Sequence, residues 1–580
     1  MTGRPRWLHG DLGGMMTTLA SRRGLLRGSV AVAGGAMFSP LLAAEAGKAD
    51  LIIHNAKIHT LDPRMPAAAA MAIAGDRIVA LGSAASLEGL VGPSTKRRDA
   101  GRATIVPGFI DCHNHARGEV LLYEVLVGNP FEVEFVTIAS IIDKLKAKAA
   151  MLPPGTWVEG FFHDDTKVKD GRPLNRFDLD KVSTQHPVIV RHRGGHTYFY
   201  NSKALEMAGI KADTPNPFGG TFDRDANGLT GRVTDRASAA FAKVGTRPVF
   251  TPAQIAERSR AGMAHISKQF VRYGLTGVHH QGGDMAAIQA IRASDELLHR
   301  VSFETSGAML DAMIANGLRT GFGDEMVRLG ATSEHTVDGS FSERTMAIST
   351  PYAGTNPPYY GNITESQEVL DAWVEKVHRA GVQVNCHANG DVPIDMVLNA
   401  FERAQKLHPV ADARPKITHC TLVNPGILKR MKALGVVPAP FTSYAYYNSD
   451  KFGFYGEAMM ANCMAFRSFL DNGIRACAGS DFSPGPFAPL MGVQGMVTRK
   501  GWNGETWGLN QRVSVTEALV INSLNGAYAS KEEDIKGSLT AGKLADYVML
   551  AEDPLTVDPE KIKDIRIIET VTGGRTVYAA

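Results

Sequence analysis

The central part of the chain alternates short apolar runs with amphipathic stretches. Helix-like segments such as "PIDMVLNAFERAQKLH" (393–408) and "GILKRMKALG" (426–435) follow several of the apolar runs. Such alternation is typical of parallel strand–helix–strand units, and eight of these units close into a barrel. We therefore predict an α/β fold with a (β/α)8 TIM-type barrel, whose strands are residues 103–110, 277–281, 300–304, 331–337, 382–387, 416–419, 435–439 and 474–480.

Both ends of the chain have a different pattern, with short segments of strand character. These are "DLIIHNAKIHTLD" and "AAMAIAGDRIVALG" near the start, and "GSLTAGKLADYVMLAED" and "IKDIRIIETVTGGRTVYA" near the end. We predict that residues 47–104 and 537–580 form one small β-sandwich domain, while residues 105–536 form the barrel. Residues from about 125 to 250 break the alternation, and we interpret them as an inserted module that covers the barrel mouth.

The first 46 residues have the pattern of a secretory signal. The segment "SRRGLLRGSVAVAGGAMFSPLLAAEA" has paired arginines, Arg22 and Arg23, then a weakly apolar stretch and small residues around Ala44 and Ala46. The paired arginines resemble a twin-arginine (Tat) signal peptide. A stable membrane anchor is disfavoured because Gly, Ser and Pro interrupt the short apolar run. We expect export through the twin-arginine machinery and a periplasmic or secreted protein.

Composition and charge exclude several classes of function. The chain is 44% hydrophobic and 21% charged, as in ordinary globular proteins. Its net charge of +3 comes entirely from residues 1–46, so the remainder is neutral and gives no sign of a nucleic-acid partner. The five cysteines are scattered and odd in number, which is not the pattern of a disulfide framework.

Residue types suited to metal binding close several of the predicted strands. His113 and His115, in "VPGFIDCHNHARGE", lie on one side of an extended segment and can converge on one cation. His387 and His419 each end an apolar run, and Asp481 follows another. One such histidine is usually structural. Four such sites, in a chain with only 18 histidines, predict a metal centre where the strands end.

These motifs resemble the amidohydrolase superfamily, in the branch similar to N-substituted formamide deformylases and related uncharacterised proteins. The resemblance extends from about residue 49 to the C-terminus and includes "PGFIDCHNH", "GGHTYFYNSKAL", "DGSFSERT", "CHANGD", "ITHC", "AGSDFSP" and "GSLTAGKLADYVML". It implies that His113 and His115 bind a more buried metal ion and that His387 and His419 bind a more exposed one.

The resemblance also implies a role for Asp481 and a class of reaction. Asp481 would bind the first metal and act as the proton shuttle. One or two divalent ions, zinc by default, would activate a water that hydrolyses an amide-type C–N bond. The substrate would be a small N-acyl or amide compound, and the sequence allows a homo-oligomer.

One position departs from the pattern of this branch. Many members carry a carboxylated lysine four residues before Asp-Gly-Ser, where this chain has Glu334. A carboxylate can also bridge two metals, so we predict that Glu334 is a ligand, while the number of metals stays open. The adjacent His335 should point the other way, although a slip of one residue would exchange the two.

Two further residues are candidates for contact with the substrate. His196, in "RGGHTYFYNS", matches a substrate-facing histidine of the family, with a buried structural role as the alternative. Tyr444 lies in the aromatic segment "APFTSYAYYNSDKFGFYG", which would line the mouth of the barrel or serve only in packing.

Other functions remain open at the level of sequence. The same metal site could serve lactone or ester hydrolysis, deamination or decarboxylation, because a fold does not fix the reaction. A non-catalytic periplasmic binding or regulatory protein is an alternative of another class. The complete ligand set and Asp481 argue against it.

Overall fold

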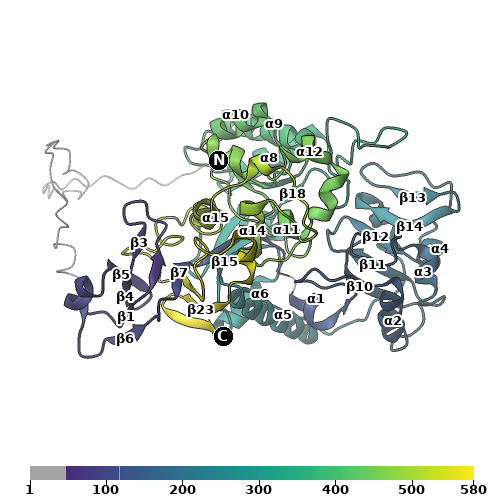
Figure 1. Ribbon diagram of the computed structural model, residues 1–580. Helices are drawn as coiled ribbons and strands as arrows, with labels where there is room; N and C mark the ends of the chain where they lie inside the picture. The colour runs from purple at the N-terminus through teal and green to yellow at the C-terminus, as the bar shows by residue number, and fades with distance from the viewer. Residues whose placement is uncertain (1–46, 117) are drawn as a thin grey trace, which may run out of the picture. The chain divides into compact units, whose positions relative to one another are not determined.

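Two parallel four-stranded sheets form the centre of the described chain, residues 47–116 and 118–580, in this computed structural model (Figure 1). The strands of the first sheet are, in spatial order, β17 (Val327–Thr332), β16 (Arg300–Thr305), β15 (Leu275–Gln281) and β8 (Phe109–Asn114). Those of the second are β18 (His335–Thr336), β19 (Asn385–Ala388), β20 (Lys416–His419) and β21 (Val437–Ala439).

The eighth predicted strand, residues 474–480, is not a regular strand in the described structure. Isolated bridges pair Asn114 with Phe482 and Phe441 with Gly479, so the segment runs between the two sheets without a continuous ladder. Its neighbour β21 contains Pro438 and is followed by Pro440, and a proline has no N–H to donate. The α/β character is as predicted, whereas the closed barrel is not assigned.

Helices accompany most of the parallel strands and lie outside the two sheets (Figure 1). In α9 the buried side chains Ile394, Val397, Leu398 and Phe401 recur with helical spacing, so one face packs inward. The longer helices are α5 (Pro252–Arg272), α6 (Met285–Ala293), α7 (Gly307–Ala315), α8 (Gln367–Arg379), α9 (Asp391–Leu407), α10 (Pro425–Leu434) and α14 (Pro489–Thr498).

Shorter helices fill the connections between these elements. They are α1 (Gly118–Tyr123), α11 (Tyr444–Tyr447), α12 (Gly456–Met460), α13 (Phe466–Asp471), α15 (Val515–Ile521) and α16 (Leu524–Ala529).

The two ends of the described chain meet in one six-stranded sheet. Its order is β24 (Arg575–Ala579), β23 (Ile567–Thr572), β22 (Tyr547–Leu550), β7 (Thr104–Pro107), β2 (Lys57–His59) and β3 (Ala67–Ala68). A second sheet consists of β5 (Arg77–Gly82), β4 (Ala70–Ala74), β1 (Leu51–His54) and β6 (Lys96–Asp99). Strand β7 precedes β8 directly, which connects this region to the site.

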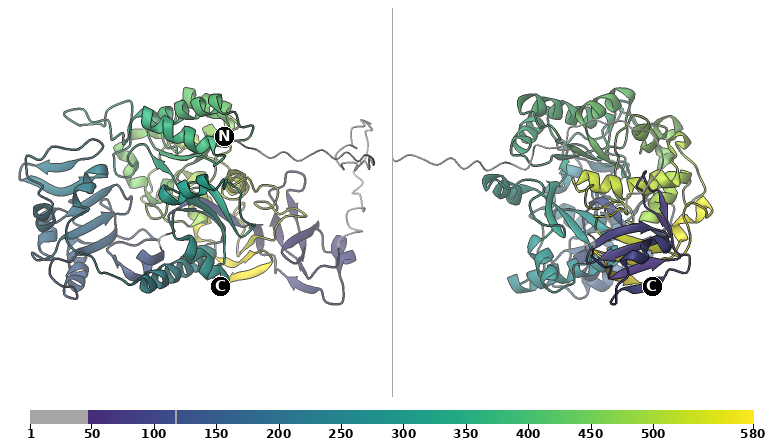
Figure 2. Two further views of the ribbon diagram at one scale, coloured as in Figure 1. Left: turned by 180° about the vertical axis from the view of Figure 1, so that it is seen from behind. Right: turned by 90° about the vertical axis from the view of Figure 1, so that its left-hand side faces the viewer.

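Residues 125–234 contribute a separate mixed sheet with its own apolar core. Its order is β13 (Phe222–Asp225), β14 (Gly228–Thr234), β12 (Thr197–Tyr200), β11 (Val188–His192), β10 (Val158–His163) and β9 (Val125–Leu126), with helices α2 (Ile138–Ala149), α3 (Arg176–Asp180) and α4 (Ser202–Met207). Figure 2 shows this sheet and the terminal sheets on opposite sides of the central strands.

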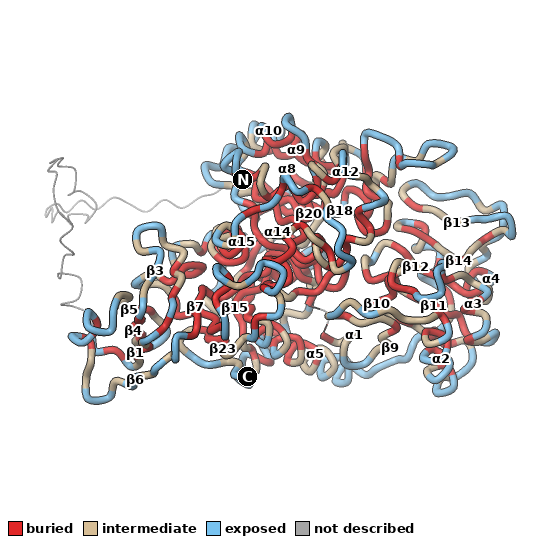
Figure 3. The backbone as a smooth tube through the Cα atoms, viewed as in Figure 1, coloured by how far each residue is buried: buried red, intermediate tan, exposed pale blue. Residues whose placement is uncertain are grey.

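Buried residues are concentrated along the central strands (Figure 3). All residues of β8, β15, β16, β19 and β20 are buried, including their polar side chains. All five cysteines are free and buried, so none forms a disulfide. Among the described helices, none is long and apolar enough to cross a membrane. The predicted signal segment, residues 1–46, lies outside the described residues.

Candidate metal centre

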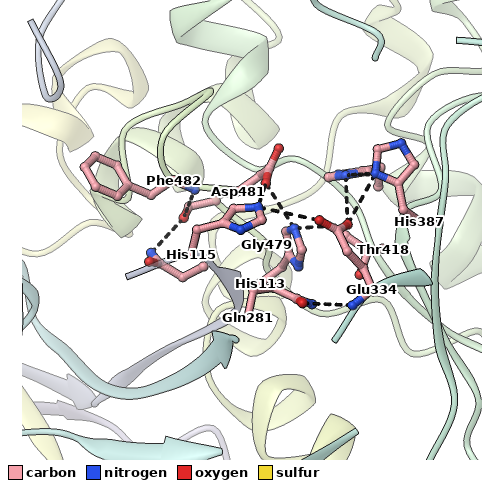
Figure 4. Close-up of polar contacts among 12 residues, drawn as sticks. His113, His115, Gln281, Glu334, His387, Thr418, Gly479, Asp481 and Phe482 are labelled. Atoms are coloured by element: carbon pink, nitrogen blue, oxygen red, sulfur yellow. Dashed lines mark hydrogen bonds and ion pairs between the residues drawn. The ribbon is translucent and has the colours of Figure 1, made fainter. Parts of the chain in front are cut away.

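The six predicted ligands come from five places in the fold and lie close together, and Figure 4 labels all of them except His419. His113 is the fifth residue of β8, and His115 follows the end of that strand. Glu334 lies between β17 and β18. His387 is on β19, His419 ends β20, and Asp481 follows the irregular segment 474–480.

Two carboxylate oxygens are at the centre of this cluster. Asp481 Oδ1 lies 3.0 Å from the Nε2 atoms of both His113 and His115. Glu334 Oε2 lies 3.4 Å from His113 Nε2, 3.3 Å from His387 Nδ1 and 3.4 Å from His419 Nε2. Its other oxygen, Oε1, is 3.5 Å from His115 Nε2. Glu334 therefore contacts both pairs of histidines.

The donor set fits a divalent cation. Ligand atoms of His113, Glu334, His419 and Asp481 all lie within 4.8 Å of one another. Glu334 Oε2 is buried and has no hydrogen-bond partner among the described residues, although three imidazole nitrogens surround it. Buried carboxylates and imidazoles in such a group are the ligands that zinc and related ions take.

Charges within the cluster hold both carboxyl groups ionised. Burial raises the pKa of Glu334, but the His113, His387 and His419 imidazoles outweigh it, and the net pKa is well below its ordinary value. The pKa of Asp481 is lowered in the same way, against burial, by His419 and by its contacts with His113 and His115. Burial and the neighbouring His387 lower the pKa of His419 to about 4, which favours its neutral form. A neutral imidazole is the form that binds a metal.

The backbone takes an unusual conformation at two of the site residues. His419 has φ 69° and Asp481 has φ 52°, in the left-handed region that residues with a side chain rarely adopt. Each such residue costs roughly 1 kcal/mol or more, and residues of this kind cluster at functional sites. The turn directs each side chain toward the cluster where the strand ends.

Buried aspartates hold the loops that carry the histidines. Asp111 accepts hydrogen bonds from the backbone N–H of His113 and from both the N–H and the hydroxyl of Ser480, at 3.2, 3.0 and 2.6 Å. It therefore ties the loop of the first strand to the residue before Asp481. Asp338 accepts from the backbone N–H groups of Asn389 and Gly390, just after His387, at 2.9 and 3.0 Å. Burial raises the pKa of Asp338 to about 6.

Comparison with known proteins identifies the chain. The model of the amidohydrolase family matches residues 97–578. The chain belongs to this family. Membership confirms the predicted enzyme class, a metal-dependent hydrolase acting on carbon–nitrogen bonds other than peptide bonds.

Two relatives and one solved structure show how far the similarity of this amidohydrolase extends. The N-substituted formamide deformylase of Arthrobacter pascens is 26% identical, covering 91% of this chain and 98% of that protein. The protein LONG AFTER FAR-RED 3 of Arabidopsis thaliana is 27% identical, covering 91% and 92%. An uncharacterized metal-dependent hydrolase from Pyrococcus horikoshii has the same fold, with a TM-score of 0.67 at 22% identity over 88% of this chain and 99% of that one.

The residue next to Glu334 points away from the cluster of this amidohydrolase. His335 stacks on Trp373, with ring centroids 4.0 Å apart, and its Nε2 pairs with Glu365. Adjacent residues of an extended segment face opposite sides, so Glu334 takes the inner side. The structure thus places these two residues in the register that we predicted.

His196 comes from the inserted sheet and lies beside the cluster. Its ring centroid is 5.3 Å from that of His387, and its Nδ1 is 2.7 Å from Asp235 Oδ1. Burial lowers the pKa of His196, but Asp235 and other carboxylates raise it to about 10 overall, so the ring is an imidazolium at neutral pH. Its Nδ1–H is directed to Asp235, which leaves Nε2–H for another acceptor.

Tyr444 is packed behind the cluster. Its ring stacks on Phe441 at 3.8 Å, and Phe441 stacks on His419 at 4.4 Å. Tyr444 is only 1% exposed, and burial together with the Asp481 charge raises the pKa of its hydroxyl well above the ordinary value. In this structure Tyr444 supports His419 through the aromatic stack.

A cavity of about 770 Å³ lies between the inserted sheet and the segment that follows Asp338. Glu343 lines it and also accepts a hydrogen bond from the backbone N–H of His196 at 3.1 Å, so the cavity wall and the His196 turn share one residue. Aromatic rings and two guanidinium groups contribute to its lining, which includes Phe199, Arg232, Arg344, Tyr352, Tyr359 and Phe454.

Sequence analysis did not identify Asp111, Asp338 or Asp235 as functional residues. Asp111 and Asp338 lie within the quoted motifs, so their motif positions were the available signal. Asp235 had none, because it meets His196 only through the antiparallel pairing that aligns Thr197 on β12 with Thr234 on β14.

Proposed function

We propose that this amidohydrolase hydrolyses the amide-type C–N bond of a small N-acyl compound, with N-substituted formamides as the first class to test. The observation that carries the proposal is the convergence of four imidazoles and two ionised carboxylates on one point, with Asp481 among them. The similarity to an N-substituted formamide deformylase along nearly the whole chain supports this substrate class.

The six residues would hold one or two divalent ions, with zinc as the default. Both oxygens of Glu334 face imidazoles, Oε1 toward His115 and Oε2 toward His387 and His419, which supports a bridging role. When bound, such ions supply Lewis acidity and lower the pKa of a water molecule.

The chain's own residues would perform the proton transfers. Asp481 is ionised, so it can accept the proton of the attacking water and deliver it to the leaving nitrogen. The His196 imidazolium, held by Asp235, would donate its Nε2–H to the substrate carbonyl oxygen and stabilise the negative charge that develops there. The substituent on nitrogen would extend toward the cavity that Glu343 lines.

We further propose how the sheets of this chain form domains and where in the cell the protein acts. The two parallel sheets and segment 474–480 would together make a (β/α)8 barrel whose eighth strand is irregular, while the terminal sheets form a β-sandwich and the inserted sheet covers the mouth. The paired arginines Arg22 and Arg23 support export through the twin-arginine machinery to the periplasm or beyond. Replacing both with lysine should keep the protein in the cytoplasmic fraction, while the unaltered chain should be recovered from the periplasm.

Product analysis on zinc-loaded protein tests the reaction. N-substituted formamides, N-acetylamines, a lactone and an aminated nucleoside would be offered to a chain that begins at Gly47. We expect formate and free amine from the formamides. Lactone opening or ammonia release without amine formation would instead establish one of the alternative reactions.

The Asp481→Asn variant tests the proton-transfer role. General acid–base catalysis contributes about 10²–10⁴-fold, so kcat should fall by that order. Asp471→Asn, at an exposed residue of α13, is the matched control and should leave kcat unchanged. Full activity in Asp481→Asn would contradict the proposal.

A further inference from the structure

A buried ion pair links strands of the two central sheets. Lys416 Nζ on β20 is 2.5 Å from Glu304 Oε1 on β16, and both side chains are at most 1% exposed. The ammonium group also donates to the backbone carbonyl of Cys112 on β8, at 2.8 Å. Burial raises the pKa of Glu304, but Lys416 and His279 outweigh it and keep the carboxyl ionised. A buried charge persists only if its remaining hydrogen-bonding positions are filled.

Gln281, the last residue of β15, donates a hydrogen bond to the second carboxylate oxygen of Glu304. Its Nε2 donates to Glu304 Oε2 at 2.9 Å. Because a carboxylate is only an acceptor, the amide nitrogen must face Glu304, and this contact sets the orientation of the amide group. The carbonyl oxygen of Gln281 therefore points the other way, toward the metal centre.

That carbonyl oxygen binds the segment that carries Glu334. Gln281 Oε1 accepts the backbone N–H of Glu334 at 2.8 Å and the hydroxyl of Ser333 at 2.5 Å (Figure 4). Glu334 lies in the break between β17, which ends at Thr332, and β18, which begins at His335. The regular ladders therefore do not include it, and the side chain of Gln281 holds its backbone instead.

We propose that Gln281 is a positioning residue that sets the reach of Glu334 toward the histidines, with the Lys416–Glu304 pair as its fixed support. This inference rests on the proposed metal-binding role of Glu334. Glu334 must meet three nitrogens at 3.3 to 3.4 Å with one oxygen, so a small displacement of its backbone changes all three contacts together. Partners that orient a metal ligand without touching the metal affect metal affinity by about 10–100-fold.

Zinc affinity, measured by competition with a chromophoric chelator, tests the proposal. Gln281→Met keeps the side-chain volume and removes all three hydrogen bonds of the amide group, and we expect zinc affinity to fall about 10–100-fold. Gln281→Asn keeps the amide but cannot span from Glu304 to Glu334, so it should also lower the affinity. If Gln281→Met does not fold, the zinc affinity of Gln281→Asn tests the proposal instead.

Gln383→Met is the matched control. Gln383 is also a buried amide, and its Nε2 donates to the carbonyls of Arg414 and Ala529 at 2.7 and 3.0 Å, away from the metal centre. Both methionine variants should lower the melting temperature of the metal-free protein, but only Gln281→Met should lower zinc affinity. Equal losses of affinity in the two variants would reduce Gln281 to a structural residue.

A double-mutant cycle separates positioning from general loosening. In a Glu334→Gln background the ligand is already altered, so adding Gln281→Met should cause little further loss of zinc affinity. A full additional loss would overturn the proposal. These affinity measurements do not depend on the substrate, so failure of amide hydrolysis and failure of the positioning role are separate results.

Discussion

At the scale of single residues, Glu334 and Asp481 contact different sets of histidines of the candidate metal centre. Asp481 contacts only His113 and His115 at 3.0 Å, whereas Glu334 contacts the imidazoles of both histidine pairs. Glu334 also occupies the position where the resemblance described above led us to expect a lysine. If the cluster binds metal, as we propose, the number of ions would depend chiefly on this side chain.

Replacement of Glu334 should change the metal content of the protein. Glu334→Gln keeps the shape of the side chain but removes its charge, and a neutral amide bridges cations poorly. We expect metal content after dialysis to fall by at least one ion per chain, as measured by atomic absorption. His335→Gln changes the neighbouring residue that faces Trp373 and should retain the full metal content. Unchanged metal content in Glu334→Gln would remove Glu334 from the site.

The pairing of His196 with Asp235 should matter for catalysis. Asp235→Asn removes the carboxylate that raises the pKa of His196 and orients its ring, so we expect kcat/KM to fall about 10²-fold. Asp225→Asn is the control, because Asp225 lies exposed in the same sheet and accepts the backbone N–H of Asn227 instead. Equal kinetics for the two variants would leave His196 with a structural role.

The residues that sequence analysis found and missed differ in their chemistry. His387, His419 and Asp481 were identified because metal-ligating side chains follow apolar strands. Gln281 also ends an apolar strand, at the boundary we predicted, but an amide is not a common metal ligand and the pattern gave it no role. Its function depends on contacts with Glu304 and Glu334, which only the folded chain brings together.

At the scale of elements, the turn between β11 and β12 connects the inserted sheet to the metal centre. Arg193 in this turn donates from Nε to the carbonyl of Ser483 at 2.9 Å, and the Ser483 hydroxyl donates to the carbonyl of Arg193 at 3.1 Å. Ser483 is two residues after Asp481, and His196 is three residues after Arg193. One turn therefore contacts both sides of the site.

Loss of Arg193 should weaken both the fold and the site. Arg193→Met leaves buried carbonyls of Asn129, Pro130 and Ser483 without a donor, so the free energy of unfolding should fall by about 2 kcal/mol or more. Urea unfolding followed by fluorescence would measure it. Arg191→Met removes a partly exposed pair with Glu159 and longer contacts with two aromatic rings, and it should cost about 0–1 kcal/mol. If the two variants lost similar amounts of unfolding free energy, the buried contacts of Arg193 would not be important for stability.

Physical properties of the chain explain which strand bounds could be predicted from the sequence. The strand predicted at residues 416–419 has those bounds in the structure, because its side chains are uniformly buried and Cys420 turns into the left-handed region at its end. Segment 474–480 is also buried, except for Arg475, but it lacks a regular ladder. The reason lies in Pro438 and Pro440 of its neighbour, so a property of one strand altered the structure of another.

At the scale of the whole molecule, charged groups join segments that are far apart in the sequence. Glu532, after α16, lies 3.1 Å from Arg328 on β17 and 2.6 Å from Lys536, and its side chain is 1% exposed. Burial raises the pKa of Glu532, but these cations outweigh it and lower the value to about 2. Since its ordinary pKa is 4.5, folding favours the ionised form.

Stability should therefore depend on pH through Glu532. A carboxyl whose folded pKa is lowered contributes its full stabilisation above the unfolded value of 4.5 and loses it as the pH falls through 2. We expect Glu532→Gln to lower the free energy of unfolding by up to about 3 kcal/mol at pH 7. The difference from the unaltered protein should narrow between pH 4.5 and 2. Glu533→Gln is the control, and it should not show this dependence on pH. If the difference in free energy of unfolding between Glu532→Gln and the unaltered protein did not vary with pH, the result would contradict this account.

The distance in sequence between His113 and Asp481 also constrains how the enzyme is produced. These two residues are in contact but 368 positions apart, and Asp111 and Ser480 join the same two segments. At a translation rate of 5–20 residues per second, the ribosome needs roughly 20 to 70 seconds to make the chain between them. A nascent polypeptide thus lacks the complete cluster until Asp481 has been synthesised. A metal ion that all six residues bind together could therefore enter only after Asp481 has been synthesised.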